Sequence, residues 1–172
     1  MPYSKDAEAL YRELEQQVRA GLAGADKIAI VGIFSGGAWL AQRLAKALQV
    51  EDRLGFLDAS FYRDDYASKG LRPDVRPSQI PFDVDGATIL LVDDVLYTGR
   101  TTRAAINELF DFGRPQRIML AALVDRGGRE LPIAADFVAD TVALEPGQSL
   151  VLQRTGFEQD GVGQLTLTVQ HA

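Results

Sequence analysis

Two adjacent carboxylates, Asp93 and Asp94, are the residues of this sequence best suited to chemistry. A turn of small and hydroxyl-bearing residues, 97–102, follows them and leads into a helical pattern. Threonine hydroxyls and the backbone N–H groups at a helix start can hold a phosphate. The carboxylates can accept hydrogen bonds from a sugar or hold a hydrated Mg²⁺. The pattern therefore predicts a site for a sugar phosphate.

A buried strand must position this pair of acids. Residues 89–92 form a continuous apolar run, which is typical of a strand buried on both faces, and the two acids are expected at its end. A helix is expected from about 101 to 112, where Gly113 would end it. The alternative role for the acids is that of simple helix caps.

Two further strands lead into glycine turns in the same way. Residues 27–33 and 117–124 are apolar runs that predict buried strands. Strands that alternate with helices predict an α/β fold with a mostly parallel central sheet. The glycine turns at 34–37, 97–100 and 126–128 would then share one edge of the sheet, where such folds bind ligands. Tight packing is the alternative explanation for any single turn.

Other segments are expected to cover this edge or the sheet. The long polar connection 62–79 is interpreted as a cationic flap that closes over an anion, the alternative being a solvated hairpin. Its cations are Arg63, Lys69, Arg72 and Arg76. Residues 149–153 and 164–169 predict two strands joined by a turn, and residues 4–22 predict an amphipathic helix.

Composition excludes several classes of protein. The length of 172 residues predicts a single domain, 1–172. The chain has no cysteine and one histidine, His171, which argues against disulfides, thiolate nucleophiles, Ser-His-Asp triads and histidine zinc sites. No apolar stretch approaches a membrane span and no signal core begins the chain, so we expect a cytoplasmic protein with no membrane partner. The net charge of −6 argues against broad nucleic-acid binding.

The stretch ILLVDDVLYTGRT, residues 89–101, resembles the phosphoribosyl-diphosphate (PRPP) binding motif of type I phosphoribosyltransferases. That motif has four apolar residues, two acids and a T-G turn. YRDD at 62–65, FGRP at 112–115 and VDRGGRELPI at 124–133 narrow the resemblance to the bifunctional pyrimidine-operon regulator/uracil phosphoribosyltransferase family. The resemblance covers nearly the whole chain. It implies the type I phosphoribosyltransferase fold, with helices around the sheet, a flexible hairpin flap and a small hood partly from about 140–170.

The resemblance also implies roles for individual residues. Asp93 and Asp94 match the acids that hold the ribose hydroxyls, and Arg63 matches a cation at the base of the flap that contacts pyrophosphate. These three are the expected catalytic residues. PRPP or UMP binding is expected of Ser35, Gly36, Gly37, Tyr97, Thr98, Gly99, Arg100, Thr101, Thr102, Asp125 and Arg126. The uracil hood is expected near Leu150 and Val151.

The implied reaction converts uracil and PRPP to UMP and pyrophosphate. Mg²⁺ is expected to bind the pyrophosphate group and water molecules, with no direct protein ligand. Such a transfer needs fixed geometry and a neutralised leaving group more than a protein nucleophile. In purine-type relatives the third residue after the acids is an acid that faces the purine N7, and here it is Tyr97, which suits a pyrimidine. The family also implies a homodimer or homotetramer.

Two departures from the family pattern bear on function. The usual T-R-G of the pyrophosphate loop is Ser35-Gly36-Gly37 here, so an arginine is missing and backbone amides would have to suffice. The usual D-R-G-H-R-E-L-P-I-R reads DRGGRELPIA, with Gly128 and Ala134 replacing a histidine and an arginine. With the net charge, these changes count against RNA binding more than against catalysis.

Two alternative functions remain open from the sequence. One is a non-catalytic, nucleotide-sensing attenuator that binds the mRNA leader of a pyrimidine operon. The other is a receiver-type phosphoacceptor, which also carries an Asp pair at a strand end. The receiver is disfavoured because the pair lies mid-chain and the T-G-R-T turn would be unexplained.

Overall fold

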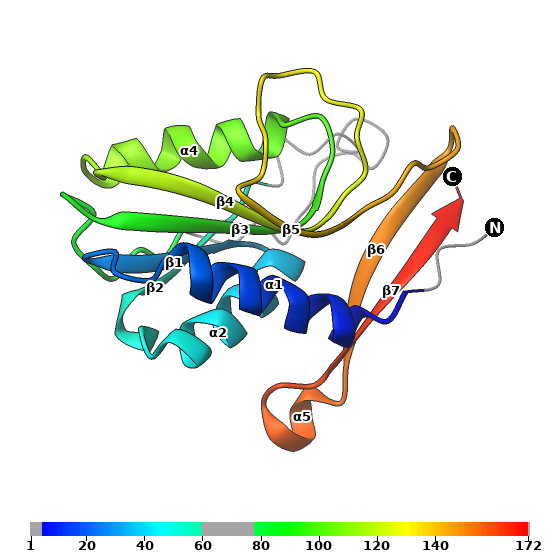
Figure 1. Ribbon diagram of the computed structural model, residues 1–172, viewed down its shortest axis with the longest axis horizontal. Coiled ribbons are helices and arrows are strands. Elements are labelled where there is room, and N and C mark those ends of the chain that lie inside the picture. Colours follow the sequence, from blue (N-terminus) through cyan, green and yellow to red (C-terminus); the bar gives the residue numbers. More distant parts are fainter. Residues whose placement is uncertain (1–4, 60–77, 172) are drawn as a thin grey trace.

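The central element is a sheet of five parallel strands in the order β2-β1-β3-β4-β5 (Figure 1). The computed structural model describes residues 5–59 and 78–171. The strands are β1 (Ile28–Ile33), β2 (Leu54–Leu57), β3 (Thr88–Leu96), β4 (Arg117–Asp125) and β5 (Phe137–Thr141). The apolar runs of β1, β3 and β4 are buried on both faces, as in parallel sheets whose two faces are covered. The predicted α/β fold is confirmed.

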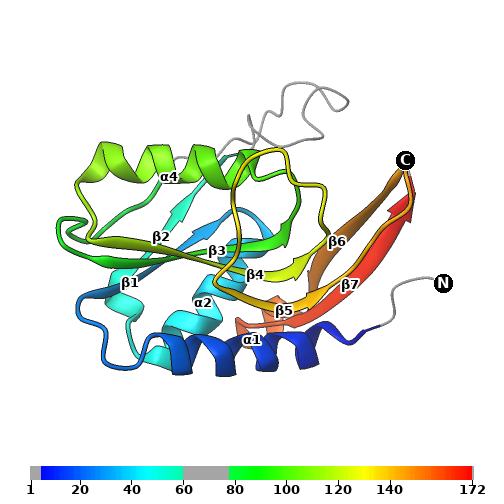
Figure 2. The same cartoon turned by 45° about the horizontal axis from the view of Figure 1, so that its top comes forward.

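Helices cover both faces of this sheet (Figures 1 and 2). One face carries α1 (Ala7–Gly21) and α2 (Gly36–Leu48), and the other carries α4 (Arg100–Phe112). Two hydrophobic clusters fill the spaces between helices and sheet. Within the part of the chain that the structure describes, no helix is long and apolar enough to cross a membrane.

A separate antiparallel hairpin stands beside the sheet, formed by β6 (Gln148–Thr155) and β7 (Gln164–His171) (Figure 1). The short helix α5 (Phe157–Asp160) lies in its turn, and the 3₁₀ turn η1 (Glu51–Arg53) precedes β2. Four leucines on one side of the hairpin join the cluster beneath α1 and α2: Leu150, Leu152, Leu165 and Leu167. The hairpin is therefore attached to the body of the protein mainly by side-chain packing.

The two acids lie inside β3 and not after its end, so the predicted boundary at Val92 is wrong. Strand β3 continues because β4 still pairs with it as far as Leu96 and Asp125. Pairing with β1 stops earlier, at Val92 opposite Gly32. From Asp93 onward, β3 therefore has a strand neighbour on one side only.

The first helix, the last turn and the flap can also be compared with the predictions. Helix α1 begins at Ala7, after Asp6, whose carboxylate accepts a hydrogen bond from the Glu8 amide at 3.0 Å. The predicted turn between the last two strands contains α5. Arg63 and residues 62–77 of the predicted flap lie outside the described residues.

The burial of Leu90 in the central strand gives a prediction for stability. Leu90 is fully buried in the cluster between β3 and helices α1 and α2. Leu90→Ala should lower the free energy of unfolding by about 2–5 kcal/mol, because the cavity it leaves cannot collapse fully. Urea denaturation measures this. The exposed Val162, substituted by alanine, should change it by less than about 0.5 kcal/mol. Equal losses for the two variants would contradict the placement of Leu90.

Candidate active site

The candidate site lies where the order of strands reverses. From β1 the chain passes to β2 on one side and then to β3 on the other. The helices that follow β1 and β3, α2 and α4, lie on opposite faces of the sheet (Figure 2). A crevice at the carboxyl end of such strands is the usual ligand site of open α/β sheets. Two helix N-termini, each able to hold an anion, therefore begin at the same edge.

The start of α2 is pressed against the acid pair. A Cβ atom at Gly37 would overlap the carbonyl oxygen of Val92, and one at Gly36 would overlap a carboxylate oxygen of Asp94. At Gly37 the neighbour is backbone, so only glycine fits there, whereas at Gly36 the neighbour is the Asp94 side chain, which a larger residue would have to displace. Ser35 occupies the N-cap position with no side-chain cap hydrogen bond, and the Phe34–Ser35 peptide bond is cis. The predicted pyrophosphate turn and the two acids are therefore in direct contact.

The acids themselves are held by local backbone bonds. Asp93 is 6% exposed, and its Oδ1 accepts from the Asp94 amide at 2.8 Å. Asp94 is half-buried, and its Oδ1 accepts from the Val95 amide at 2.8 Å, while its Oδ2 lies over Gly36. Within residues 5–59 and 78–171, no group of three or more histidines or acids could hold a metal ion. Carboxylate oxygens are nonetheless the ligands that suit a partly hydrated Mg²⁺, so this pair fits a Mg²⁺ shared with a substrate.

The turn after β3 shapes the start of α4. Thr98 is buried, and its Oγ1 accepts from the Arg100 amide at 3.2 Å. Thr102 is 1% exposed, and its Oγ1 has no hydrogen-bond partner among the described residues. A buried hydroxyl without a partner is uncommon, so Thr102 has unused hydrogen-bonding capacity at this helix start.

The segment that follows β4, residues 126–133, makes hydrogen bonds to the turn at 97–100. Glu130 donates its amide to the Thr98 carbonyl at 2.9 Å, and its carboxylate accepts from Arg100 Nη2 at 2.6 Å. Arg129 binds the Asp125 carboxylate at 2.6 Å and the Ile133 carbonyl at 2.7 Å, and also donates to the Tyr97 carbonyl. Arg129 was not among the residues predicted from the sequence. Its spacing of four residues from Asp125 was the available signal.

Tyr97 and Arg126 form a stacked pair at the same edge. The Arg126 guanidinium carbon lies 3.8 Å from the centroid of the Tyr97 ring. Its Nε is buried with no hydrogen-bond partner among the described residues. Gly128 makes room for the ring, because a Cβ there would lie 2.5 Å from Tyr97 Cε1. Asp125, by contrast, already binds the Gly127 amide at 2.9 Å as well as Arg129.

The structure brings some of the predicted site residues together and separates others. The structure brings the 35–37 turn to Asp93 and Asp94, and it brings residues 97–102 to the segment after β4. Leu150 and Val151 do not share a surface, because neighbouring strand residues face opposite sides. Leu150 is buried in the core cluster, whereas Val151 is half-buried on the other side of β6.

Comparisons with known proteins place the chain in a family. The profile of the phosphoribosyl transferase domain matches residues 4–145. The bifunctional protein PyrR of Ralstonia nicotianae is 53% identical over 153 residues, which cover 88% of this chain and 87% of that protein. The chain belongs to the PyrR family of phosphoribosyltransferases. The PyrR protein of Pseudomonas aeruginosa strain PAO1 is 49% identical over 146 residues, covering 84% of this chain and 85% of its own.

Solved structures agree on the fold. A hypoxanthine phosphoribosyltransferase from Trypanosoma cruzi matches with a TM-score of 0.66 and 18% identity, covering 97% of this chain and 94% of its own. A hypoxanthine-guanine phosphoribosyltransferase from Bacillus anthracis matches with a TM-score of 0.63 and 16% identity, covering 88% of each chain. At these identities the similarity shows the fold alone. The type I phosphoribosyltransferase fold and the PyrR family resemblance expected from the sequence are both confirmed.

The fit of Tyr97 against Gly128 can be tested with a neighbouring glycine as control. Gly127 and Gly128 both have positive φ, at 71° and 79°, so alanine at either should cost about 1–2 kcal/mol of backbone strain. Only the Gly128→Ala methyl meets Tyr97, since nothing lies within 4 Å of a Cβ at Gly127. Gly128→Ala should therefore shift the NMR resonances of the Tyr97 ring, and Gly127→Ala should not. Identical spectra for the two variants would contradict the stacked arrangement.

Proposed function

We propose that this protein is a uracil phosphoribosyltransferase that converts uracil and PRPP to UMP and pyrophosphate. One observation carries the proposal: the acid pair lies between two helix starts on opposite faces of the sheet. PRPP has an anionic group at each end of its ribose. Two helix N-termini that flank two carboxylates match that distribution, because amides favour the anions and carboxylates accept from the sugar hydroxyls.

Each part of PRPP then has a complementary group. The 5′-phosphate is assigned to the start of α4, with the backbone amides of residues 98–102 other than that of Arg100, which donates to Thr98. The Thr102 hydroxyl, which has no partner among the described residues, is assigned to the same phosphate. The ribose hydroxyls are assigned to Asp93 and Asp94. Pyrophosphate is assigned to the backbone amides of the 35–37 turn, where no side chain fits at Gly36 or Gly37 without a shift. Arg63, as the sequence resemblance implies, would add a cation on the leaving group.

Magnesium is the expected cofactor. When bound to PRPP it would neutralise the pyrophosphate charge, and Asp93 and Asp94 are the residues that would hold its waters. In the reaction the bond from C1′ to the pyrophosphate oxygen breaks, uracil N1 bonds to C1′, and the N1 proton is released. The protein's own part is to hold the two reactants in line and to keep the ribose fixed against the acids.

Recognition of the base is assigned to the Tyr97–Arg126 pair. The buried Nε of Arg126 has no hydrogen-bond partner in the part of the chain that the structure describes, and a guanidinium can donate to a carbonyl oxygen of a pyrimidine. Tyr97 stands where purine-type relatives have an acid for N7, so this position offers no such partner to a purine. Of the predicted hood residues, Val151 remains the better candidate to face the base, because Leu150 is committed to the core.

Substitution of the acids tests the assignment. Asp93→Asn and Asp94→Asn should each lower the rate of UMP formation by about a hundredfold or more, because a developing charge and the sugar hydroxyls lose their partner. The assay is conversion of radiolabelled uracil with PRPP and Mg²⁺, with hypoxanthine in parallel to test the base preference. Asp26→Asn is the control, since Asp26 is an exposed acid that precedes β1 at the other edge of the sheet.

The assay distinguishes support for the proposed activity from its refutation. Activity with uracil, none with hypoxanthine and loss only in the Asp93 and Asp94 variants would support the proposal. No UMP from the wild-type protein, or full activity in Asp94→Asn, would overturn it.

A second function, RNA-linked regulation, is favoured by one observation. Relatives that are about half identical over most of the chain are named bifunctional proteins. The net charge of −6 works against broad phosphate contacts, so any such binding must use a local basic surface.

The regulatory function has its own test. If it is retained, binding to pyrimidine-operon leader RNA should strengthen with UMP and weaken steeply with salt. Electrophoretic mobility shifts at several salt concentrations measure this, with a scrambled RNA as control. A flat titration would remove this second function. RNA binding without any UMP formation would instead favour a non-catalytic sensor.

A further inference from the structure

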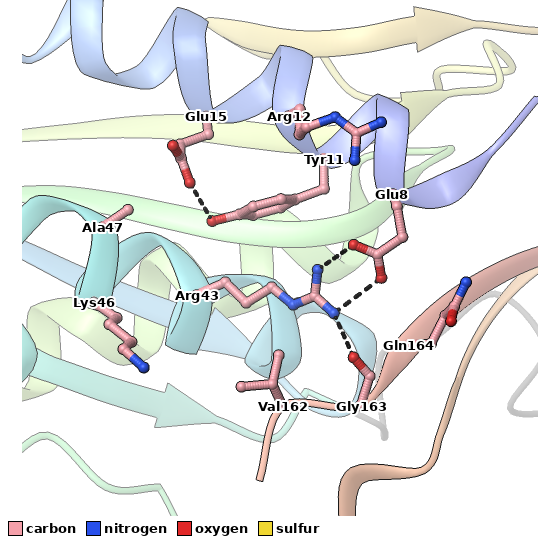
Figure 3. A pocket seen from close by; sticks show the side chains of 10 residues that line it. All are labelled: Glu8, Tyr11, Arg12, Glu15, Arg43, Lys46, Ala47, Val162, Gly163 and Gln164. Carbon is pink, nitrogen blue, oxygen red and sulfur yellow. Dashed lines mark hydrogen bonds and ion pairs between the residues drawn. The ribbon is translucent and has the colours of Figure 1, made fainter. Parts of the chain in front are cut away.

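A groove of about 550 Å³ lies between α1, α2 and the start of β7 (Figure 3). None of the predicted PRPP-site residues that the structure describes lines it. Glu8 of α1 and Arg43 of α2 meet there in a two-pronged ion pair, with nitrogen–oxygen distances of 2.6 and 3.0 Å. The two side chains are only 23% and 14% exposed. Such geometry is more specific and less mobile than that of a surface ion pair.

Both partners of this ion pair also bind the hairpin. Arg43 Nη2 donates to the Gly163 carbonyl at 3.0 Å, and the Leu165 amide donates to Glu8 at 2.8 Å. The pKa of Glu8 is lowered, chiefly by its bond to Arg43 and also by the Leu165 amide, against an opposing effect of burial. Figure 3 shows the Arg43 guanidinium between Glu8 and Gly163. One ion pair thus joins three segments that are far apart in the sequence.

The hairpin needs such an attachment. Its two strands form their own sheet and share no strand pairing with the central one. A two-stranded hairpin is marginally stable unless it packs on something else. A second contact supports the same end, because the Arg154 guanidinium lies 4.9 Å from the Trp39 ring and 4.4 Å from the Phe157 ring. Trp39 and Arg43 are four residues apart, so one face of α2 holds the hairpin turn.

The same helix begins at the acid pair. The first residues of α2, Gly36 and Gly37, contact β3 at Val92 and Asp94, and β6 also packs against β3. Helix α2 therefore contacts both the hairpin turn and the acid pair, while α1 and the four buried leucines hold the rest of the hairpin. Val151, the half-buried residue of β6 that the proposed function assigns to the base, belongs to this hairpin.

We propose that Glu8 and Arg43 are positioning residues: they hold the β6–β7 hairpin in place and thereby set the affinity for the base without touching a substrate. This inference rests on the proposed function of a uracil phosphoribosyltransferase. It assigns no chemistry to the groove itself. Its specific content is that loss of the ion pair affects uracil binding more than PRPP binding or the chemical step.

The test compares three variants with a matched control. Arg43→Met removes the charge and all three hydrogen bonds of the guanidinium, Arg43→Lys keeps the charge but not the two-pronged geometry, and Glu8→Gln keeps the shape of the side chain. The control is Glu15→Gln, which breaks the ion pair of Glu15 with Arg19 beside the same groove. Glutamine can still accept the hydrogen bond from the Tyr11 hydroxyl, whose ring lies against Arg43, and the structure gives Glu15 no bond to the described residues of the hairpin. Steady-state kinetics for both substrates and amide hydrogen exchange are measured well below the unfolding temperature.

The expected result is a split in the kinetic constants. Arg43→Met and Glu8→Gln should raise the KM for uracil about tenfold, with the KM for PRPP and kcat within about twofold, and the Leu165 amide should exchange about tenfold faster. Arg43→Lys should be intermediate and Glu15→Gln unchanged. If Arg43→Met fails to fold, Arg43→Lys and Glu8→Gln carry the test.

Three results would overturn the inference. One is a lower unfolding temperature with an unchanged KM for uracil, which would show a merely structural role. Another is an equal rise in both KM values or a loss confined to kcat. The third is unchanged exchange at Leu165, and because exchange needs no substrate, it is readable even if the wild-type protein makes no UMP and the proposed function itself fails.

Discussion

The close approach of α2 to β3 is the constraint on which the rest of the site depends. No Cβ fits at Gly37 beside the Val92 carbonyl oxygen unless that backbone moves, so the helix can begin there only with glycine. This contact places the amides of the 35–37 turn next to Asp94. It also fixes the direction of α2, whose Trp39 and Arg43 then meet the hairpin. One backbone contact therefore orders the 35–37 turn, the two acids and the β6–β7 hairpin.

The charges at this edge form a pattern that a polyanion with hydroxyl groups would satisfy. Two carboxylates lie near the carboxyl end of the central strands, and each already accepts a hydrogen bond from a neighbouring backbone amide. Alone they would repel a phosphorylated ligand, and the two helix starts on opposite faces supply the compensating positive ends. A divalent cation would complete the balance. The arrangement is therefore better suited to holding a charged sugar than to attacking it, in keeping with a transfer reaction that needs no protein nucleophile.

Much of the fold could be predicted from the sequence, because its determinants are local. The apolar runs 27–33, 89–92 and 117–124 form the strands expected of them, and the T-G turn precedes a helix. The end of β3 could not be predicted from its own residues, because pairing with β4 extends the strand as far as Leu96. The parallel order of the strands placed three turns on one edge, as expected.

Contacts between residues that are far apart in the chain could not be predicted from the sequence. Arg129 supports the turn at Tyr97 only because the 126–133 segment folds back over β3. Glu8 and Arg43 are separated by 35 positions, and no local pattern links them. The two hood residues, Leu150 and Val151, were expected to act together, but strand alternation turns one of them into the core.

The most direct test of the central claim is a crystal structure of the protein with UMP, followed by one with PRPP and Mg²⁺. We expect the 5′-phosphate at the start of α4 against residues 98–102, the ribose hydroxyls on Asp93 and Asp94, and pyrophosphate on the amides of 35–37. Density for the phosphate elsewhere, or a 35–37 turn that makes no contact with pyrophosphate, would contradict the claim that the two helix starts and the acid pair form one site.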